Sequence, residues 1–313
     1  MTPSFDTVLA GTEALIEGLR APDSMQEILE YPLHKARAHV FRDPEWPVIQ
    51  LPLLLSRNFD VSPDIAVGLA MASLLLYGFA DITDDAQDGD LRGDWGWERA
   101  VNAGNALAFL AHRTLLELPL ESLVQATLTH ALTSAGLAMT FGQENDLRAT
   151  FPRVPSVEEY FQTIQRKTGG SAAFFAKAAA IASRQSPGLI ETLHRIGEHL
   201  GTYHQLLSDL DAFTQAESSD LRNRKVTLPL IYTLNQSSEE SKNLAQLLSN
   251  GTKSEDLEQI LMQSGSRAYC QMKAQLIRRQ ALALLMDSPL SPETQEAVSR
   301  QFRMRSGVQA FDL

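Results

Sequence analysis

The sequence has little cysteine and fewer basic than acidic side chains. It contains one cysteine, Cys270, in 313 residues, so a disulfide bond cannot form within the chain. We interpret Cys270 as a small buried side chain, because no motif of a reactive thiol surrounds it. The formal net charge is −11. This charge argues against nucleic acid or an anionic membrane surface as a partner.

The sequence also lacks a long apolar run and a targeting signal. Its longest apolar run, residues 65–80, has 16 residues, whereas a transmembrane helix needs about 20. Asp64 and Asp81 close this run at its two ends. The N-terminus carries Asp and Glu and does not open with the basic stretch of a secretory signal. We therefore expect a cytoplasmic protein without stable membrane insertion, in which residues 65–80 form a buried core helix.

No segment shows sustained alternation of apolar and polar residues, so the sequence does not predict β-strands. Apolar residues recur instead at helical spacing, and one long helix is predicted from the Ser62 cap to Gly89. No internal repeat or linker divides the chain. The sequence predicts a single all-α domain, residues 1–313, with ten or more helices. Further predicted helical stretches are 97–118, 120–142, 156–184, 188–214, 225–249, 254–263, 266–286 and 291–304.

The long predicted helix ends in a cluster of acids, DITDDAQDGD, at residues 81–90. Acids at positions i, i+3, i+4 and i+7 lie on one face of a helix; here they are Asp81, Asp84, Asp85 and Asp88. Like charges at this spacing repel, and the C-terminus of a helix disfavours negative charge. A cation would offset both effects, and carboxylate oxygens are ligands that suit Mg²⁺. The cluster therefore predicts a magnesium site.

Four other polar segments lie beside predicted apolar helices. Gln205 and Asp209 are four residues apart and share one helix face. Lys167 and Lys225 lie at a helix break and before a helix, and basic side chains beside Mg²⁺ are a common way to hold a diphosphate. The four segments are GQENDL (142–147), QRKTGG (165–170), HQLLSDLDAF (204–213) and LRNRKVTLPL (221–230).

Taken in order, these segments resemble the motifs of the trans-isoprenyl diphosphate synthase, or polyprenyl synthetase, family. DDAQD (84–88) is similar to the first aspartate-rich motif, DDxxD, and HQLLSDLDAF to the second, FQxxDDxxD. GQENDL, KTGG (167–170) and RKVTLPLIYTL (224–234) are similar to the GQxxD, KT and KxTLPL segments. The resemblance covers about residues 30–240. It implies the isoprenoid synthase fold, a helical bundle around a deep central cavity.

The resemblance further implies a site for prenyl diphosphate substrates and two or three Mg²⁺ ions. The implied metal ligands are Asp84, Asp88 and Asp209. The implied catalytic residues are Asp84, Asp85, Asp88, Lys167 and Lys225. The implied substrate-binding residues are Lys35, Arg37, Arg92, Gln143, Thr168, Gln205 and Phe79. A homodimer is expected by analogy with the family.

Three segments depart from the family pattern. Ser208, Asp209 and Ala212 stand where the second motif has three aspartates. The GGKRxRP motif, which binds isopentenyl diphosphate in the family, is reduced to PLHKARA (32–38), which lacks the glycines and the final proline. The segment after DDxxD is LRG, with Arg92 in place of two arginines.

The resemblance implies a Mg²⁺-dependent prenyltransferase that ionises an allylic prenyl diphosphate and condenses it with isopentenyl diphosphate to a short-chain product. The departures leave three alternatives open. A terpene synthase would cyclise or hydrolyse the prenyl diphosphate without isopentenyl diphosphate. A second alternative transfers the prenyl group to another acceptor, such as a peptide side chain, and a third is a non-catalytic partner subunit of a synthase. In this family the side chains just before DDxxD form the cavity floor, so a bulky Phe79 predicts a short product.

Overall fold

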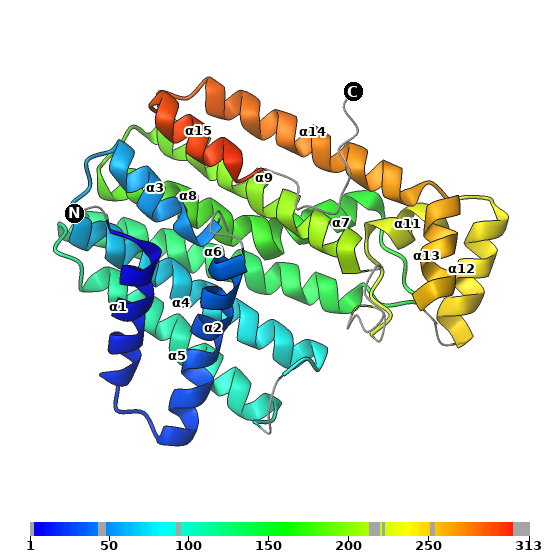
Figure 1. Cartoon of the computed structure of the whole chain (residues 1–313), viewed down its shortest axis with the longest axis horizontal. Helices are drawn as coiled ribbons and strands as arrows, with labels where there is room; N and C mark the ends of the chain where they lie inside the picture. Colours follow the sequence, from blue (N-terminus) through cyan, green and yellow to red (C-terminus); the bar gives the residue numbers. More distant parts are fainter. Residues whose placement is uncertain are drawn as a thin grey trace.

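A computed structural model of the chain describes residues 3–42, 48–91, 95–212, 220, 223–250 and 254–302 (Figure 1). Within these ranges the named elements are all helices, and the one β-type pairing is an isolated bridge between Thr150 and Lys225. The all-α prediction is confirmed. The helices are α1 (Phe5–Glu17), α2 (Asp23–Arg42), η1 (Val48–Gln50), α3 (Leu51–Asn58), α4 (Pro63–Asp88), α5 (Trp97–Leu116), α6 (Ser122–Arg148), α7 (Val157–Ile164), η2 (Gln165–Gly169), α8 (Gly170–Ala182), α9 (Pro187–Ala212), α11 (Leu228–Leu234), α12 (Glu239–Asn250), α13 (Ser254–Gln263), α14 (Ser266–Met286) and α15 (Pro292–Arg300).

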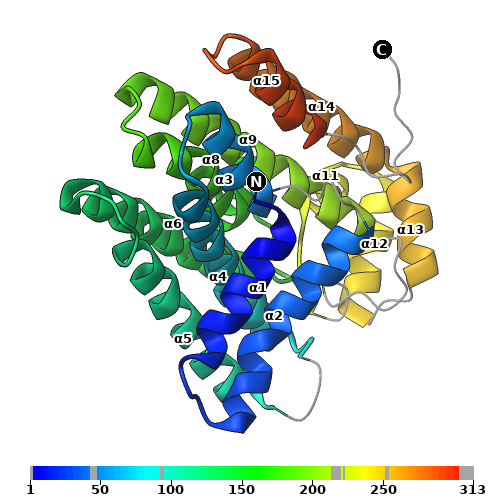
Figure 2. The same ribbon diagram turned by 60° about the vertical axis from the view of Figure 1, so that its left-hand side comes forward.

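The apolar helix α8 lies at the centre of the bundle. Phe174 and Phe175 are buried, and so are most of the alanines around them. A helix that is apolar on all sides is typical of a core position. It packs against α3, α4, α6 and α9. Helix α14 runs along α9, and α1 and α2 pack against α4, as two views of the molecule show (Figures 1 and 2).

Helix α4 is the core helix predicted from the apolar run. Of the described helices it alone is long and apolar enough to cross a membrane, but 61% of its most apolar window is buried inside the molecule. Ser62 occupies the N-cap position without a side-chain hydrogen bond, and Pro63 is the first helical residue. Gly89 ends the helix in the left-handed region, at φ 74°, and its N–H bonds to the carbonyl of Asp85. This end positions the acidic cluster.

A π-helical turn, Gln165–Gly169, joins α7 to α8 without breaking the helical path. The sequence predicted a helical stretch over 156–184 with a break near Lys167; the stretch is helical from 157 to 182, and a π-helical turn takes the place of the break. The turn fits because two glycines face it: a Cβ on Gly142 of α6 would lie 2.3 Å from the backbone nitrogen of Lys167, and one on Gly201 of α9 would lie 2.4 Å from the carbonyl oxygen of Thr168. Such turns inside helices are frequent at functional sites. The close approach positions Lys167 and Thr168 between α6 and α9.

Two predicted helical stretches have different bounds in the structure. Residues 225–249 form two helices, α11 and α12, separated at 235–238. Ser238 accepts a hydrogen bond from the backbone of Ser241, and this kind of local side-chain bond favours a helix start over a helix interior. Helix α6 extends to Arg148 rather than ending at 142. Gln143 and Asp146 are therefore both on α6, three residues apart on one face.

Candidate active site

One side of the acidic cluster on α4 is neutralised by a lysine from α2. The Nζ atom of Lys35 lies 2.8 Å from Oδ1 of Asp81 and 2.8 Å from Oδ2 of Asp85. Tyr31, one turn before Lys35, donates its hydroxyl to Asp85 at 3.3 Å. Burial lowers the pKa of Lys35, but the two carboxylates outweigh this effect and hold the pKa above its ordinary value. Lys35 therefore lies at the cluster with its charge already paired.

The other side of the cluster faces two lysines from distant parts of the chain. Lys167 Nζ lies 3.0 Å from Oδ1 of Asp84, and Lys225 Nζ lies 2.6 Å from Oδ2 of Asp88. Asp146 lies between the lysines, with its Oδ2 at 2.8 Å from Lys167 and 3.1 Å from Lys225. Burial raises the pKa of Asp146, but the two lysines lower it below its ordinary value. Each lysine is thus held by carboxylates from α4 and α6.

Gln143 on α6 also contacts the DDxxD motif. Its Nε2 donates to Oδ1 of Asp84 at 2.7 Å and to Oε1 of Gln87 at 2.9 Å. Gln143 and Asp146 share a helix face, so one element provides both the amide and the carboxylate. The structure therefore brings the GQxxD segment, the KT segment and the first aspartate-rich motif to one place.

Asp209 on α9 lies in a hydrogen-bonded group at the opposite wall. Tyr160 of α7 donates its hydroxyl to Oδ2 of Asp209 at 2.7 Å, and Gln205 Nε2 donates to Oδ1 at 2.8 Å. Thr168 in turn donates its hydroxyl to Oε1 of Gln205 at 2.6 Å. Burial and the charge of Asp220 raise the pKa of Asp209 to about 7, against the effect of its two hydrogen bonds.

The charged side chains surround an acidic pocket of about 310 Å³. Its described lining contains seven aspartates and only two lysines: Asp84, Asp85, Asp88, Asp90, Asp146, Asp209, Asp220, Lys167 and Lys225. Burial and the neighbouring Asp84 raise the pKa of Asp88, although Lys225 acts in the opposite direction. Like carboxylates at this density repel, and a pocket with such an excess of negative charge favours added cations.

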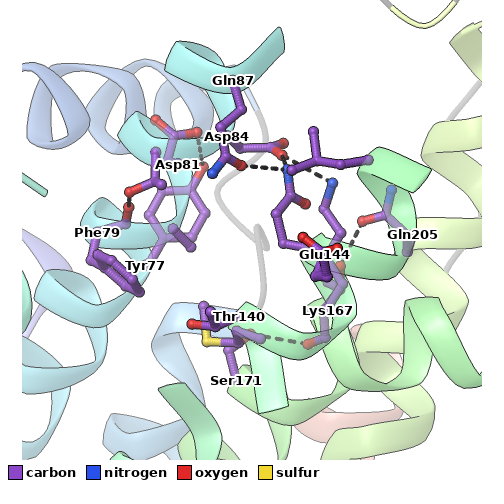
Figure 3. Close-up of a pocket in the computed structure, with 16 residues that line it drawn as sticks. Tyr77, Phe79, Asp81, Asp84, Gln87, Thr140, Glu144, Lys167, Ser171 and Gln205 are labelled. Atoms are coloured by element: carbon purple, nitrogen blue, oxygen red, sulfur yellow. Dashed lines mark hydrogen bonds and ion pairs between the residues drawn. The ribbon is translucent and has the colours of Figure 1, made fainter. Parts of the chain in front are cut away.

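A second cavity, of about 340 Å³, adjoins the acidic pocket and is mainly apolar. Figure 3 shows Tyr77 and Phe79 of α4 on one side of it and Lys167 and Gln205 on the other. Ala80, Met139 and Leu147 complete its apolar lining. The two cavities share Asp84, Lys167 and Gln205. A ligand with a charged head and an apolar chain fits such a pair of cavities.

The carboxylates of α4 fit a divalent cation. Asp84 accepts hydrogen bonds from the protein only at Oδ1, and Asp88 only at Oδ2, so each has a second oxygen without a donor in the described part of the chain. The two residues are one helical turn apart, and Mg²⁺ takes one or two carboxylates while keeping several waters. Among the described residues, no group of three or more His, Cys, Asp or Glu side chains is already arranged to bind a metal ion. Water or substrate oxygens would have to complete the coordination.

Among the described residues, two predicted substrate-binding residues, Lys35 and Arg37, line neither cavity. Arg37 points away from the acidic cluster and pairs with Glu13 of α1 at 2.8 Å, on a side that is mostly exposed. The helical spacing explains this, because Lys35 and Arg37 are two residues apart and cannot share a face of α2. Arg92 lies outside the described residues. Ser208 and Ala212 line the acidic pocket without a carboxylate.

The sequence did not single out three residues that the structure brings to the site. Tyr31 bonds to Asp85, Tyr160 bonds to Asp209, and Asp220 lines the acidic pocket 3.7 Å from Lys225. Asp220 directly precedes the basic segment LRNRK (221–225), and this position could have indicated that Asp220 belongs to the site. The tyrosines sit in amphipathic helices, where an aromatic residue ordinarily indicates the core.

Comparison with known proteins identifies the family. A sequence model described as polyprenyl synthetase matches residues 83–263, more than half of the chain. A short chain isoprenyl diphosphate synthase of Methanothermobacter thermautotrophicus is 31% identical over 222 residues, which cover 64% of this chain and 66% of that protein. The chain matches 57% to 66% of the length of the first curated relatives, which is less than two thirds.

Solved structures show the same fold. A polyprenyl synthetase from Streptomyces coelicolor A3(2) superposes with a TM-score of 0.79 at 23% identity, over 95% of this chain and 96% of that one. A polyprenyl synthase from Caulobacter crescentus CB15, solved in complex with calcium and isoprenyl diphosphate, superposes with a TM-score of 0.74 at 20% identity, over 96% and 97% of the two chains. The isoprenoid synthase fold implied by the motifs is confirmed. The chain belongs to the polyprenyl synthetase family.

Proposed function

We propose that this protein is a Mg²⁺-dependent prenyltransferase that ionises an allylic prenyl diphosphate and joins it to isopentenyl diphosphate, giving a short-chain product. The observation that supports this most is the direct connection between a mainly apolar cavity and an acidic pocket with one buried lysine, Lys225, and one partly buried lysine, Lys167. The pocket suits a metal-bound diphosphate, and the cavity suits the prenyl chain. The family relationship and the Caulobacter complex with calcium and isoprenyl diphosphate support the same function.

The residues have distinct roles in this proposal. Asp84 and Asp88 would hold Mg²⁺, two or three ions in all, with water and phosphate oxygens as further ligands. The bound metal supplies positive charge that stabilises the leaving diphosphate. Lys167 and Lys225, now paired with carboxylates, turn to the phosphate oxygens when substrate and metal enter. Thr168 contacts the same diphosphate.

The apolar cavity protects the allylic cation after the C–O bond breaks. Tyr77, Phe79 and Met139 exclude water from the chain, so that the cation reacts with the second substrate rather than with water. Phe79 lies in the wall formed by α4, five residues before Asp84. Its ring restricts the length of chain that the cavity can hold, which favours a short product.

A second function is supported by the state of the basic motif on α2. In the family the equivalent motif binds isopentenyl diphosphate, but here Lys35 is paired with Asp81 and Asp85, and Arg37 with Glu13. The pairing of Arg37 with Glu13, outside the two cavities, favours a terpene synthase, which ionises the prenyl diphosphate and uses no isopentenyl diphosphate. A non-catalytic partner subunit is disfavoured, because Asp84, Asp88, Lys167 and Lys225 are all present and assembled.

A product assay separates these functions. The purified protein is incubated with Mg²⁺ and allylic diphosphates of one to four isoprene units, with and without isopentenyl diphosphate, and the products are identified by mass spectrometry. The proposal requires longer diphosphates that form only when isopentenyl diphosphate is present. Hydrocarbons or alcohols formed without it would establish the terpene synthase. No product under any condition would contradict both and would point to a missing acceptor or to a partner subunit.

We also propose a single cytoplasmic domain that forms a homodimer. Helices α5 and α6 pack side by side at the left of Figure 2. Large apolar side chains of these helices are exposed to solvent, namely Phe109, Leu116, Leu123, Leu137 and Phe141. Exposed apolar patches of this kind mark interaction surfaces. The negative charge and the burial of α4 support the absence of nucleic-acid and membrane partners.

A further inference from the structure

Asp209 is the remaining acid of the second aspartate-rich motif, and its environment differs from that of Asp84 and Asp88. Its side chain is 5% exposed, and both oxygens accept hydrogen bonds from the protein. Asp84 and Asp88, which line the same pocket as Asp209, each have an oxygen without a donor among the described residues. Each α4 carboxylate thus has one oxygen free of the described donors, whereas each oxygen of Asp209 already accepts one hydrogen bond.

Moving Asp209 into a coordination sphere would leave a buried donor unpaired. Tyr160 is also buried, and its hydroxyl donates to Oδ2 of Asp209. A buried hydroxyl that loses its acceptor is destabilising, which holds Asp209 in place. Ser208 and Ala212, which lie one residue before and three after Asp209, provide no carboxylate that could chelate the ion with it.

The hydrogen bonds of Asp209 set the orientation of Gln205. The side-chain amide of glutamine has a donor end and an acceptor end, and a carboxylate can only accept. Asp209 therefore draws Nε2 of Gln205 toward itself, at 2.8 Å, and turns Oε1 toward Thr168. The hydroxyl of Thr168 donates to this oxygen at 2.6 Å. Thr168 and the adjacent Lys167 both line the apolar cavity, and Lys167 also lines the acidic pocket.

We propose that Asp209 is a positioning residue that aligns Gln205 and Thr168, and that the direct carboxylate ligands of the divalent cation come from α4. This inference rests on the proposed function for the identity of the site. In this proposal, a series of hydrogen bonds orients the polar wall of the cavity; it runs Tyr160–Asp209–Gln205–Thr168. The α9 residues Gln205 and Asp209 then do not contact the metal directly, and their effect on it passes through the bound diphosphate.

Metal binding tests the first half of the proposal. Mn²⁺ binding to the full-length protein is measured by electron paramagnetic resonance, with the same substitution at two sites, Asp84→Asn and Asp209→Asn. We expect Asp84→Asn to weaken Mn²⁺ binding about tenfold or more, and Asp209→Asn to change it by about twofold at most. Equal weakening by the two substitutions would overturn the inference. This comparison needs no substrate and no turnover.

Substrate binding tests the positioning half. Asparagine can still accept from Gln205 through its carbonyl, whereas leucine cannot. Affinity for a non-ionising prenyl thiodiphosphate in Mn²⁺ should be largely retained in Asp209→Asn and fall about tenfold in Asp209→Leu, with Mn²⁺ binding intact in both. If Asp209→Leu does not fold, as judged by circular dichroism, Thr168→Val takes its place and should give the same loss. Unchanged thiodiphosphate affinity in the folded variant would contradict the positioning role.

The two proposals fail in different ways. Wild-type protein that binds Mn²⁺ but no prenyl thiodiphosphate would refute the proposed function. The comparison of Asp84→Asn with Asp209→Asn would still decide which carboxylate is a metal ligand.

Discussion

At the scale of single residues, Lys225 has the most demanding environment of the site. Its side chain is 6% exposed, and its Nζ lies 2.6 Å from Asp88, 3.1 Å from Asp146 and 3.7 Å from Asp220. Burial lowers the pKa of Lys225, but Asp146, Asp84 and Asp88 raise it, and the net effect is a pKa above the ordinary value. Lys225 is therefore charged in the folded protein, and the carboxylates around it depend on that charge.

Replacing Lys225 by methionine should destabilise the protein and make it respond to metal. Removing one partner of a buried ion pair leaves uncompensated charges, so we expect Lys225→Met to lose about 3 kcal/mol of unfolding free energy. Mg²⁺ should restore part of this loss, because the cation replaces the missing charge beside Asp88 and Asp146. Urea unfolding with and without Mg²⁺ measures both effects. In Lys242→Met, which removes a 78% exposed lysine, the change should stay below about 0.5 kcal/mol. An equal loss in both variants would contradict the prediction.

Phe79 tests the connection between cavity shape and product. Phe79→Ala removes an aromatic ring from the wall of the apolar cavity and leaves room for a longer chain. We expect the distribution of products, read by mass spectrometry, to shift to longer chains by one isoprene unit or more. Met272→Ala is the control, because it removes an exposed apolar side chain of α14, outside the proposed dimer interface. Unchanged product length in Phe79→Ala would show that another side chain limits the product.

At the scale of elements, the site depends on how closely α6 and α9 approach the π-helical turn at Gln165–Gly169. Gly142 and Gly201 meet the backbone of this turn from its two sides. The turn and its neighbours provide Lys167 and Thr168, while α6 and α9 provide Gln143 and Gln205. The sequence predicted these segments as separate polar motifs. Their juxtaposition follows from backbone packing at two glycines, which single-sequence periodicity does not describe.

A methyl group at either glycine should disturb this packing. A Cβ at Gly142 or Gly201 would overlap backbone atoms, which cannot rotate away as a side chain can. We expect Gly142→Ala and Gly201→Ala each to lower the unfolding free energy by about 2 kcal/mol, and to weaken binding of a prenyl thiodiphosphate. Gly188→Ala, in the first turn of α9, meets no atom within 4 Å and should be neutral or stabilise by about 0.5 kcal/mol. Thermal and urea unfolding of the three variants measure this difference, and a neutral Gly142→Ala would contradict it.

At the scale of the whole molecule, the sequence predicted the acidic cluster and most helices from α4 onward well, because both depend on local spacing, but it did not single out α1, α2 and α3. The partners of the acids were harder to predict. Lys225 and Asp88 are 137 residues apart in the chain, and Tyr160 and Asp209 are 49 apart. Lys35 was assigned to a diphosphate, but the fold places it against Asp81 and Asp85. Pairings of this kind depend on tertiary distances, and no residue pattern in one sequence records them.

The exposed face of α5 and α6 makes a final prediction about the assembled molecule. Leu137 and Phe141 are one helical turn apart on α6 and are 53% and 56% exposed. In a homodimer through this face, an aspartate at either position would be buried without a partner charge, which is strongly unfavourable. We expect Leu137→Asp and Phe141→Asp to be monomers at concentrations where the unmodified protein is a dimer, as measured by light scattering after gel filtration.

The control for this experiment lies on another face. Met286, at the end of α14, is 53% exposed, so Met286→Asp adds the same charge at a position of similar exposure outside the proposed interface. It should leave the mass unchanged. Dissociation by Met286→Asp but not by Phe141→Asp would move the interface to α14, and a monomeric unmodified protein would refute the dimer. Because Thr140, next to Phe141, lines the apolar cavity, a dimer through α6 would also place the partner subunit beside the prenyl chain. Monomeric Phe141→Asp should then release a less uniform set of products than the dimer.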